Sequence, residues 1–137
     1  MFLLDTNVVS ELRKAAKAEL RVVRWAGTVA AGDLYISAIS ILEIEAGILL
    51  LERRDHRQGS ILRTWLEKQV LPAFEGRVLP IDTAVARRCA LLHVPDARSD
   101  RDVLIAATAL VHGMTVVTRN VADFQSTGVR LVNPWEE

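Results

Sequence analysis

Four acidic residues fall where the chain leaves a predicted strand or enters a predicted helix, and they are the candidates for a functional site. Asp5 follows the apolar run Phe2-Leu3-Leu4, while Glu43, Asp102 and Asp123 each come just after a strand pattern or at the start of a helix pattern. Carboxylates within a few ångströms of one another repel, and without compensation at least one of them takes up a proton at neutral pH. A divalent cation removes that conflict, so the pattern indicates a metal site.

The ligands on offer are oxygen atoms, and this selects the kind of metal. No cysteine falls near the acids, and His56, His93 and His112 belong to other segments. Oxygen ligands favour Mg²⁺ or Mn²⁺ over zinc or copper. Because Mg²⁺ held by a few carboxylates completes its shell with water and phosphate oxygens, the expected chemistry is hydrolysis of a phosphate ester.

A second interpretation treats each acid as part of a helix cap. Ser40-Ile41-Leu42-Glu43 and Ser99-Asp100-Arg101-Asp102 have the spacing of capping boxes, Asn120-Val121-Ala122-Asp123 is a looser version, and Asp5 can cap the helix that follows it. A cap contributes about 1 kcal/mol, but caps have no reason to gather at one edge of a sheet. A carboxylate as surrounded by apolar residues as Glu43 is also costly to bury without a partner. Spacing alone leaves both interpretations open.

Short apolar runs alternate with longer helical patterns along the chain, which is typical of an α/β protein with a parallel sheet. Strands are predicted at residues 2–4, 34–37, 78–81, 114–117 and 130–132. Helices are predicted at residues 8–27, 42–51, 61–73, 84–92 and 103–111. Right-handed crossovers bring the carboxyl ends of parallel strands to one edge of the sheet, so the acids are expected to converge there.

Composition describes one folded domain spanning residues 1–137. The chain is 50% hydrophobic and 25% charged, and at this length it can bury roughly two-thirds of its unfolded surface. Lys plus Arg and Asp plus Glu both number 17, for a net charge of zero. That balance argues against a protein that coats nucleic acid or anionic membranes by bulk charge.

The same inventory bears on location. The single Cys89 has no partner within the chain, and no Cys/His spacing suits zinc, so a disulfide-rich secreted scaffold is not expected. The most apolar stretch, residues 39–51, contains two glutamates and falls short of the roughly 20 residues a membrane span needs. The N-terminus shows no export signal. A cytoplasmic protein without a membrane anchor is therefore predicted.

Several other residues receive structural readings. Asp82 is predicted to cap a helix, and Glu45 is predicted to face away from Glu43 because the two lie two residues apart on a helix. Gly47, one turn beyond Glu43, is interpreted as allowing close helix packing or a dimer contact. The charged run at residues 52–57 is predicted to be a solvated helix end and loop, and Trp135 to dock the C-terminus.

The strings around the acids resemble the PIN-domain family, and within it toxins of the VapC and FitB type. Four motifs carry the resemblance, in order and with matching spacing: Leu4-Asp5-Thr6-Asn7, residues 40–47, residues 102–109 and residues 117–124. Residues 79–82 and the closing Asn133-Pro134-Trp135 extend it along nearly the whole chain. The resemblance implies a three-layer α/β/α fold with a short, mainly parallel central sheet, RNA cleavage dependent on Mg²⁺ or Mn²⁺, and a homodimer.

Matching motifs place Asp5, Glu43 and Asp102 at the positions of the family's three constant acids. The fourth acid of the family stands either where this chain has Asn120 or a few residues later, where it has Asp123. Asn120 adds no charge, so Asp123 is expected to be the fourth carboxylate, with one or two ions left open. In a metal-dependent mechanism Asp5 and Asp102 hold the ion, while Glu43 and Asp123 orient the attacking water or hold a second ion.

Further polar residues lie beside these acids in the sequence. Candidates for contacts that fix the carboxylates, each equally open to a role as a cap or strand-end polar group, are Asn7, Ser37 and Thr118. Candidates for contacts with RNA phosphates, each equally open to being an ordinary surface arginine, are Arg98, Arg101 and Arg119.

The resemblance further implies a toxin of a type II toxin–antitoxin pair. Its expected partners are an RNA substrate, a cognate antitoxin of the VapB or FitA kind in a hetero-oligomer, and DNA only through that antitoxin. The alternative is a non-catalytic module that acts by binding a DNA-binding partner. Two other enzyme classes fit less well. A phosphatase wants a second aspartate where Asn7 stands, and a receiver domain wants a lysine that does not follow Val117 or Val132.

Overall fold

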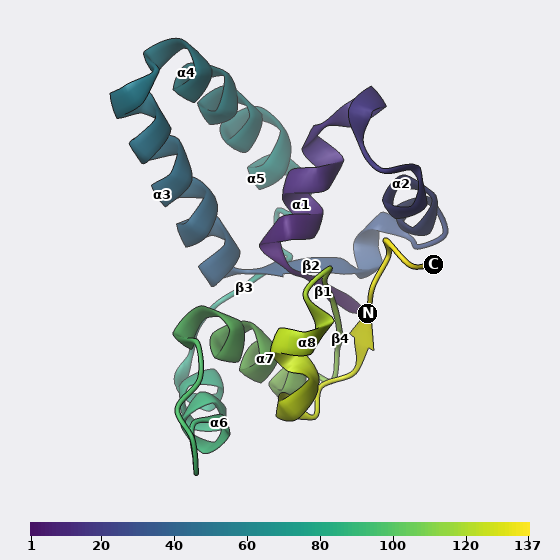
Figure 1. The fold of residues 1–137 in the computed structure, drawn as a ribbon, viewed down its shortest axis with the longest axis vertical. Coiled ribbons are helices and arrows are strands. Elements are labelled where there is room, and N and C mark those ends of the chain that lie inside the picture. The colour runs from purple at the N-terminus through teal and green to yellow at the C-terminus, as the bar shows by residue number, and fades with distance from the viewer.

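The computed structural model describes residues 1–137 and has a five-stranded sheet in the order β3-β2-β1-β4-β5 (Figure 1). Each neighbouring pair of strands is parallel. The strands are β1 (Phe2–Leu4), β2 (Leu34–Ser37), β3 (Val78–Leu79), β4 (Thr115–Val117) and β5 (Leu131–Val132). Because all run the same way, their carboxyl ends share one edge of the sheet, as predicted.

Helices cover both faces of this sheet (Figure 1). On one face lie α1 (Thr6–Arg13), α2 (Leu20–Gly27), α3 (Ala38–Arg54), α4 (His56–Trp65) and α5 (Leu71–Ala73). On the other lie α6 (Thr83–Leu92), α7 (Asp100–His112) and α8 (Val121–Phe124). The predicted three-layer α/β/α fold is confirmed.

Alternating side chains of the central strands explain the two layers. Leu4, Ile36 and Val117 belong to a buried cluster with apolar residues of the helices on the first face. Leu3 and Val116 belong to a second cluster with residues of α7 and α8. Since successive side chains of a strand point to opposite faces, a run of three apolar residues serves both cores.

Short polar residues set the helix boundaries next to the site, and a glycine ends α7 at the opposite edge of the sheet. The side chain of Asp5 accepts a hydrogen bond from the backbone N–H of Thr6 at the start of α1. Ser37 caps α3, and its hydroxyl accepts from the N–H of Ile39. Gly113, at φ 67°, ends α7 in the left-handed conformation that glycine adopts without a steric penalty.

One predicted helix is wrong. Residues 8–27 do not form a single helix, because the chain breaks after α1, makes the short 3₁₀ turn Ala15–Lys17 and restarts at α2. Ala15 has a φ of 52°, which no helix interior accommodates. The buried carboxylate of Glu11 accepts from the backbone N–H of Glu19 across this break, 3.0 Å away. The apolar periodicity continues through both helices and so conceals the turn.

The other helices begin or end differently from their predicted bounds. Helix α3 starts at Ala38 and runs to Arg54, so Ser40 lies inside it and the capping box read at residues 40–43 is wrong. Helix α4 follows after one residue, Asp55, which caps it. The charged run is therefore a tight exposed corner and not a loop. Beyond α4 the chain continues through a π-helical turn (Leu66–Val70) into α5, inside the range predicted as one helix.

The predictions for Asp82, Glu45 and Trp135 are confirmed. The side chain of Asp82 accepts from the N–H of Val85 and caps α6. Glu45 points away from Glu43 and pairs with Arg63. The C-terminal Trp135 packs against the first core. No helix is long and apolar enough to cross a membrane.

Candidate active site

Asp5 sits at the end of β1, only 7% exposed, with both carboxylate oxygens in use. Oδ1 accepts from the backbone N–H of Thr6 at 2.8 Å, and Oδ2 accepts from the hydroxyl of Thr118 at 2.8 Å. Burial raises the pKa of Asp5 from its ordinary value, and the repulsion of Asp102 and Glu43 adds to the rise, while the two hydrogen bonds lower it. The protein thus holds this carboxylate in one orientation, while burial and the neighbouring acids disfavour its ionised form.

Glu43 lies in the second turn of α3 and reaches back to the start of α1. Its Oε1 accepts from the hydroxyl of Thr6 at 2.9 Å, and its Oε2 lies 3.7 Å from Nη1 of Arg101 on α7. The Thr6 hydroxyl is also 3.0 Å from the hydroxyl of the fully buried Ser40. Since Thr6 gives its one proton to the carboxylate, Ser40 donates to Thr6. Glu43 is therefore tied to two other segments of the chain, the start of α1 and the first turn of α7.

Asp102 and Asp123 come from the opposite layer and are held less firmly. Asp102 is half-buried in the first turn of α7, and Asp123 is exposed on α8. Burial raises the pKa of Asp102, and the charges of Asp123 and Glu43 raise it further, with Ser99 the one neighbour that lowers it. The charges of Asp102 and Glu43 thus act on Asp5, and those of Asp123 and Glu43 act on Asp102, at the carboxyl edge of the sheet.

Asn7 and Thr118 form a network next to Asp5. The amide nitrogen of Asn7 lies 3.4 Å from Asp5 Oδ2 and 3.3 Å from the hydroxyl of Thr118. Thr118 in turn accepts from the backbone N–H of Asn120 at 3.0 Å. The side-chain oxygen of Asn7 accepts from the backbone N–H of Arg119, 3.4 Å away. These bonds join the end of β1 to the end of β4 across the centre of the sheet, where open parallel sheets bind their ligands.

The other predicted contacts divide between the site and the scaffold. Ser37 serves as the cap of α3 and makes no hydrogen bond to the acids. Arg98 is bound to the protein, since its Nε donates to the carbonyl of Leu92 at 2.7 Å and its guanidinium donates to Ser126. Arg119 is exposed, with its guanidinium carbon 5.3 Å from the ring centroid of Trp135.

Two residues that hold the site were missed by the sequence reading. Thr6, between Asp5 and Asn7, is not among the predicted site residues, and Ser40 is predicted to be a cap. A usable signal existed for Ser40, because residues three apart on a helix share a face, so Ser40 lies beside Glu43. For Thr6 the only signal was its place inside the polar triplet, since its partners lie 34 and 37 residues away.

The donor set fits a hard divalent cation in its chemistry, although no three His, Cys, Asp or Glu side chains are already arranged as a metal-binding group. Carboxylate oxygens are the ligands Mg²⁺ and Mn²⁺ prefer. Asp5 and Glu43 already have hydrogen-bond donors that fix their orientation. Asp102 and Asp123 have fewer hydrogen-bond donors to fix their orientation.

Comparison with known proteins identifies the family of this chain. The model of the PIN domain family matches residues 2–129. The VapC ribonuclease Y4jK of Sinorhizobium fredii is 39% identical over 141 residues, covering 99% of each chain. The toxin FitB of Neisseria gonorrhoeae is 38% identical over 143 residues, covering 100% of each. In the crystal structure of FitAcB from Neisseria gonorrhoeae, a chain 37% identical superposes with a TM-score of 0.90, with complete coverage of both chains.

The chain therefore belongs to the PIN domain family. Similarity along its whole length places it, within that family, with the toxins of the VapC and FitB type. The resemblance drawn from the sequence motifs is confirmed.

Proposed function

We propose that this protein is a metal-dependent endoribonuclease, the toxin of a type II toxin–antitoxin pair, which hydrolyses RNA phosphodiester bonds with Mg²⁺ or with Mn²⁺ in its place. The supporting observation is the meeting of Asp5, Glu43, Asp102 and Asp123 from four separate segments, with burial and mutual repulsion raising the pKa of Asp5 and of Asp102. Folding alone gives no reason to gather these charges. Binding of a divalent cation and a phosphate would explain why these acids lie close together.

Asp5 and Asp102 are the proposed ligands, with Glu43 and Asp123 orienting the attacking water or serving a second ion. When bound, the ion supplies polarisation of the phosphate and a lowered pKa for a coordinated water. The hydroxyl of Thr118 fixes the position of Oδ2 of Asp5. Burial raises the pKa of Asp5, so its ionised form is disfavoured and a bound cation would stabilise it. Contacts of this kind, one step out from the ligands, set their orientation and basicity.

Two exposed arginines at this edge are the proposed contacts for RNA phosphates. Arg101 precedes Asp102, and its ion pair with Glu43 is half open to solvent. Arg119 lies next to Asn7 and is exposed. Arg98 is a weaker candidate because its guanidinium already serves Leu92 and Ser126.

The relatives suggest the partners. VapC and FitB are named as a ribonuclease and a toxin, and FitB was crystallised within FitAcB. We infer a cognate antitoxin of the VapB or FitA kind that covers the acids, a homodimer of the toxin, and a hetero-oligomer that contacts DNA through the antitoxin alone. A nuclease of this kind acts on cytoplasmic RNA.

The test is cleavage of RNA by the purified chain, freed of any antitoxin, with Mg²⁺, with Mn²⁺ and with chelator. Cleavage is expected with either ion, and its loss is expected in chelator and in the Asp5→Asn and Asp102→Asn variants. Asp33→Asn, which removes an exposed acid from a distant turn, is the matched control and is expected to cleave normally. If the wild-type chain cleaves no RNA with either ion, the non-catalytic binding module becomes the better account.

A further inference from the structure

A hollow of about 240 Å³ opens directly beside Glu43, between α1 on one side and α3 and α4 on the other. Thr6 and Glu43 belong both to its lining and to the candidate active site. The rest of its lining includes Ser10, Arg13, Gly47 and Trp65. The hollow therefore borders the candidate active site at these two residues.

Polar groups line the α1 side at regular steps. Thr6, Ser10 and Arg13 are four and three residues apart, the spacing that places side chains on one helix face. Two hydroxyls and a guanidinium thus lead outward from the carboxylates along one wall. Arg13 takes part in none of the ion pairs of the structure, so its charge is free to meet an anion.

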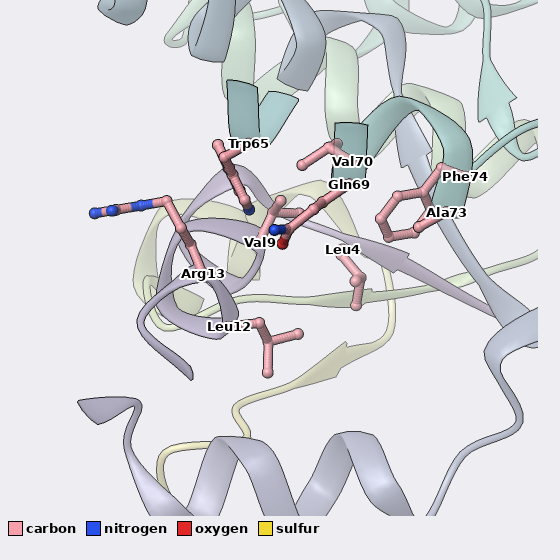
Figure 2. A pocket seen from close by; sticks show the side chains of 9 residues that line it. All are labelled: Leu4, Val9, Leu12, Arg13, Trp65, Gln69, Val70, Ala73 and Phe74. Atoms are coloured by element: carbon pink, nitrogen blue, oxygen red, sulfur yellow. The ribbon is translucent and has the colours of Figure 1, made fainter. Parts of the chain in front are cut away.

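Arg13 of α1 and Trp65 of α4 form a cation–π contact at the end of the groove, with the guanidinium over the ring. The guanidinium carbon of Arg13 lies 5.8 Å from the centroid of the Trp65 ring. Both residues also line an adjoining apolar hollow of about 190 Å³, where Figure 2 shows them at one end and Phe74 at the other. Aromatic rings and arginine planes are the groups on which bases of single-stranded nucleic acid stack.

Gly47 has no role in packing within the chain. Glycine inside a helix costs about 1 kcal/mol relative to alanine, so its presence in the middle of α3 calls for a reason. A Cβ atom built on Gly47 would meet no atom within 4 Å, whereas one on Gly59 of α4 would come within 2.7 Å of the Glu52 backbone. Close helix packing explains Gly59 but not Gly47. At Gly47 the missing side chain leaves the floor of the hollow open.

We propose that this groove binds the nucleotide next to the scissile phosphate, with its base against Trp65 and over Gly47 and its outer phosphate at Arg13. The inference rests on the proposed nuclease function and adds to it the path of the RNA. A volume of about 240 Å³ is below the range of roughly 300–1,000 Å³ that whole small-ligand sites occupy, so it suits a single base. The free charge of Arg13 and the continuity with Glu43 favour RNA over a protein segment.

The test measures binding of a short fluorescent single-stranded RNA in chelator, where no cleavage occurs, together with steady-state cleavage in Mg²⁺. Gly47→Leu fills the hollow without removing a polar group, and Arg13→Gln removes the charge alone. Each is expected to weaken RNA binding about tenfold, Gly47→Leu through a lost base–aromatic stack and Arg13→Gln through a lost phosphate contact. Each is also expected to raise KM with little change in kcat.

Matched controls separate this effect from general damage. Gly27→Leu changes another helical glycine whose Cβ would meet no atom within 4 Å, and Arg24→Gln removes an exposed charge from α2. Both are expected to bind RNA within twofold of the wild type. Gly47→Ala is expected to bind RNA more tightly than Gly47→Leu and to unfold at a higher temperature than the wild type.

The outcomes are distinct. Wild-type RNA affinity and KM in both Gly47→Leu and Arg13→Gln would overturn the groove while leaving the nuclease intact. Loss of antitoxin binding with unchanged RNA binding would also overturn it, in favour of a protein-docking groove. If the wild-type chain neither binds nor cleaves RNA, the proposed function fails and the groove assignment with it.

Discussion

Asp5 and Asp102 carry the same charge and both have a pKa raised first of all by burial, but the protein treats their oxygens differently. Asp5 receives the Thr6 N–H and the Thr118 hydroxyl, each at 2.8 Å, which oppose the rise. Asp102 has only Ser99 to lower its pKa, and the charges of Asp123 and Glu43 rank next after burial in raising it. The fold therefore orients Asp5 with two hydrogen-bond donors, while Asp102 has one neighbour that favours its ionised form.

This difference assigns separate tasks to the two layers. The layer of α1 and α3 supplies carboxylates already fixed by hydrogen bonds, which in the proposed nuclease lowers the reorganisation needed when substrate binds. The layer of α7 and α8 supplies carboxylates whose mutual repulsion lowers the stability of the fold. Such strain at a functional site is the usual trade between stability and activity.

The largest effect is expected from removing either central acid. Asp5→Asn and Asp102→Asn should each reduce cleavage by more than about 100-fold, since even changes to residues that support metal ligands cost about 10–100-fold. The two should differ in stability. In chelator, Asp102→Asn should raise the unfolding temperature, because it removes a poorly solvated charge. Asp5→Asn should gain less, because its new amide N–H₂ meets hydrogen-bond donors. Thermal unfolding of both variants measures the difference.

The pH dependence of that stability follows from the direction of the pKa shift. A carboxyl group whose pKa is raised by folding destabilises the folded state once it is charged, so stability is lost as pH rises through the range above its ordinary value of 3.8. The advantage of Asp102→Asn over wild type should therefore be full at neutral pH and vanish in acid. An advantage independent of pH would contradict the electrostatic explanation.

A smaller effect is expected from the hydroxyl that holds Asp5. Thr118→Val removes that donor and should lower metal affinity or cleavage by about 10–100-fold. Thr108→Val is the matched control, because Thr108 is equally buried at 0% exposure and its hydroxyl serves only the carbonyl of Leu104 in α7. Both changes should cost about 1 kcal/mol of stability. Equal cleavage by the two variants would show that fixing Asp5 does not matter.

Thr6→Val is expected to have an effect of about tenfold on cleavage, at the lower end of such changes. It removes the hydroxyl that meets Glu43 at 2.9 Å, but Arg101 remains beside the other oxygen of that carboxylate. Thr6→Ser keeps the donor and should restore most of the activity. Failure of serine to restore it would assign Thr6 a packing role through its methyl group.

Some features of the fold and of the site are predictable from the sequence, and others are not. Strand positions and the three layers follow from apolar runs such as residues 2–4, because burial on two faces leaves a local pattern. The gathering of the four acids follows from topology, since parallel strands end at one edge. Both are properties of short segments together with general rules about how segments connect.

Other features depend on contacts between distant segments, and the sequence pattern does not carry them. The break at Ala15 lies within a continuous apolar periodicity. Arg98 looks like a free surface arginine until the fold brings Ser126 to it. Thr6 finds Glu43 only because α1 and α3 start side by side at the edge of the sheet. Sequence spacing can place a residue at the site, but its hydrogen-bond partner is identified only from the three-dimensional structure.

The smallest effect is expected at the link between the two layers, the ion pair of Arg101 with Glu43. At 3.7 Å and half exposed, such a pair is worth less than about 1 kcal/mol, so Arg101→Gln should barely change the unfolding temperature. Removing a positive charge beside the acids should nevertheless tighten Mn²⁺ binding about threefold, because like charges repel across the partly screened site. Calorimetric titration of metal-free protein measures this. Arg101→Lys should bind Mn²⁺ as the wild type does, and weaker binding by Arg101→Gln would mean that the arginine orders Glu43 for the ion and does not compete with it.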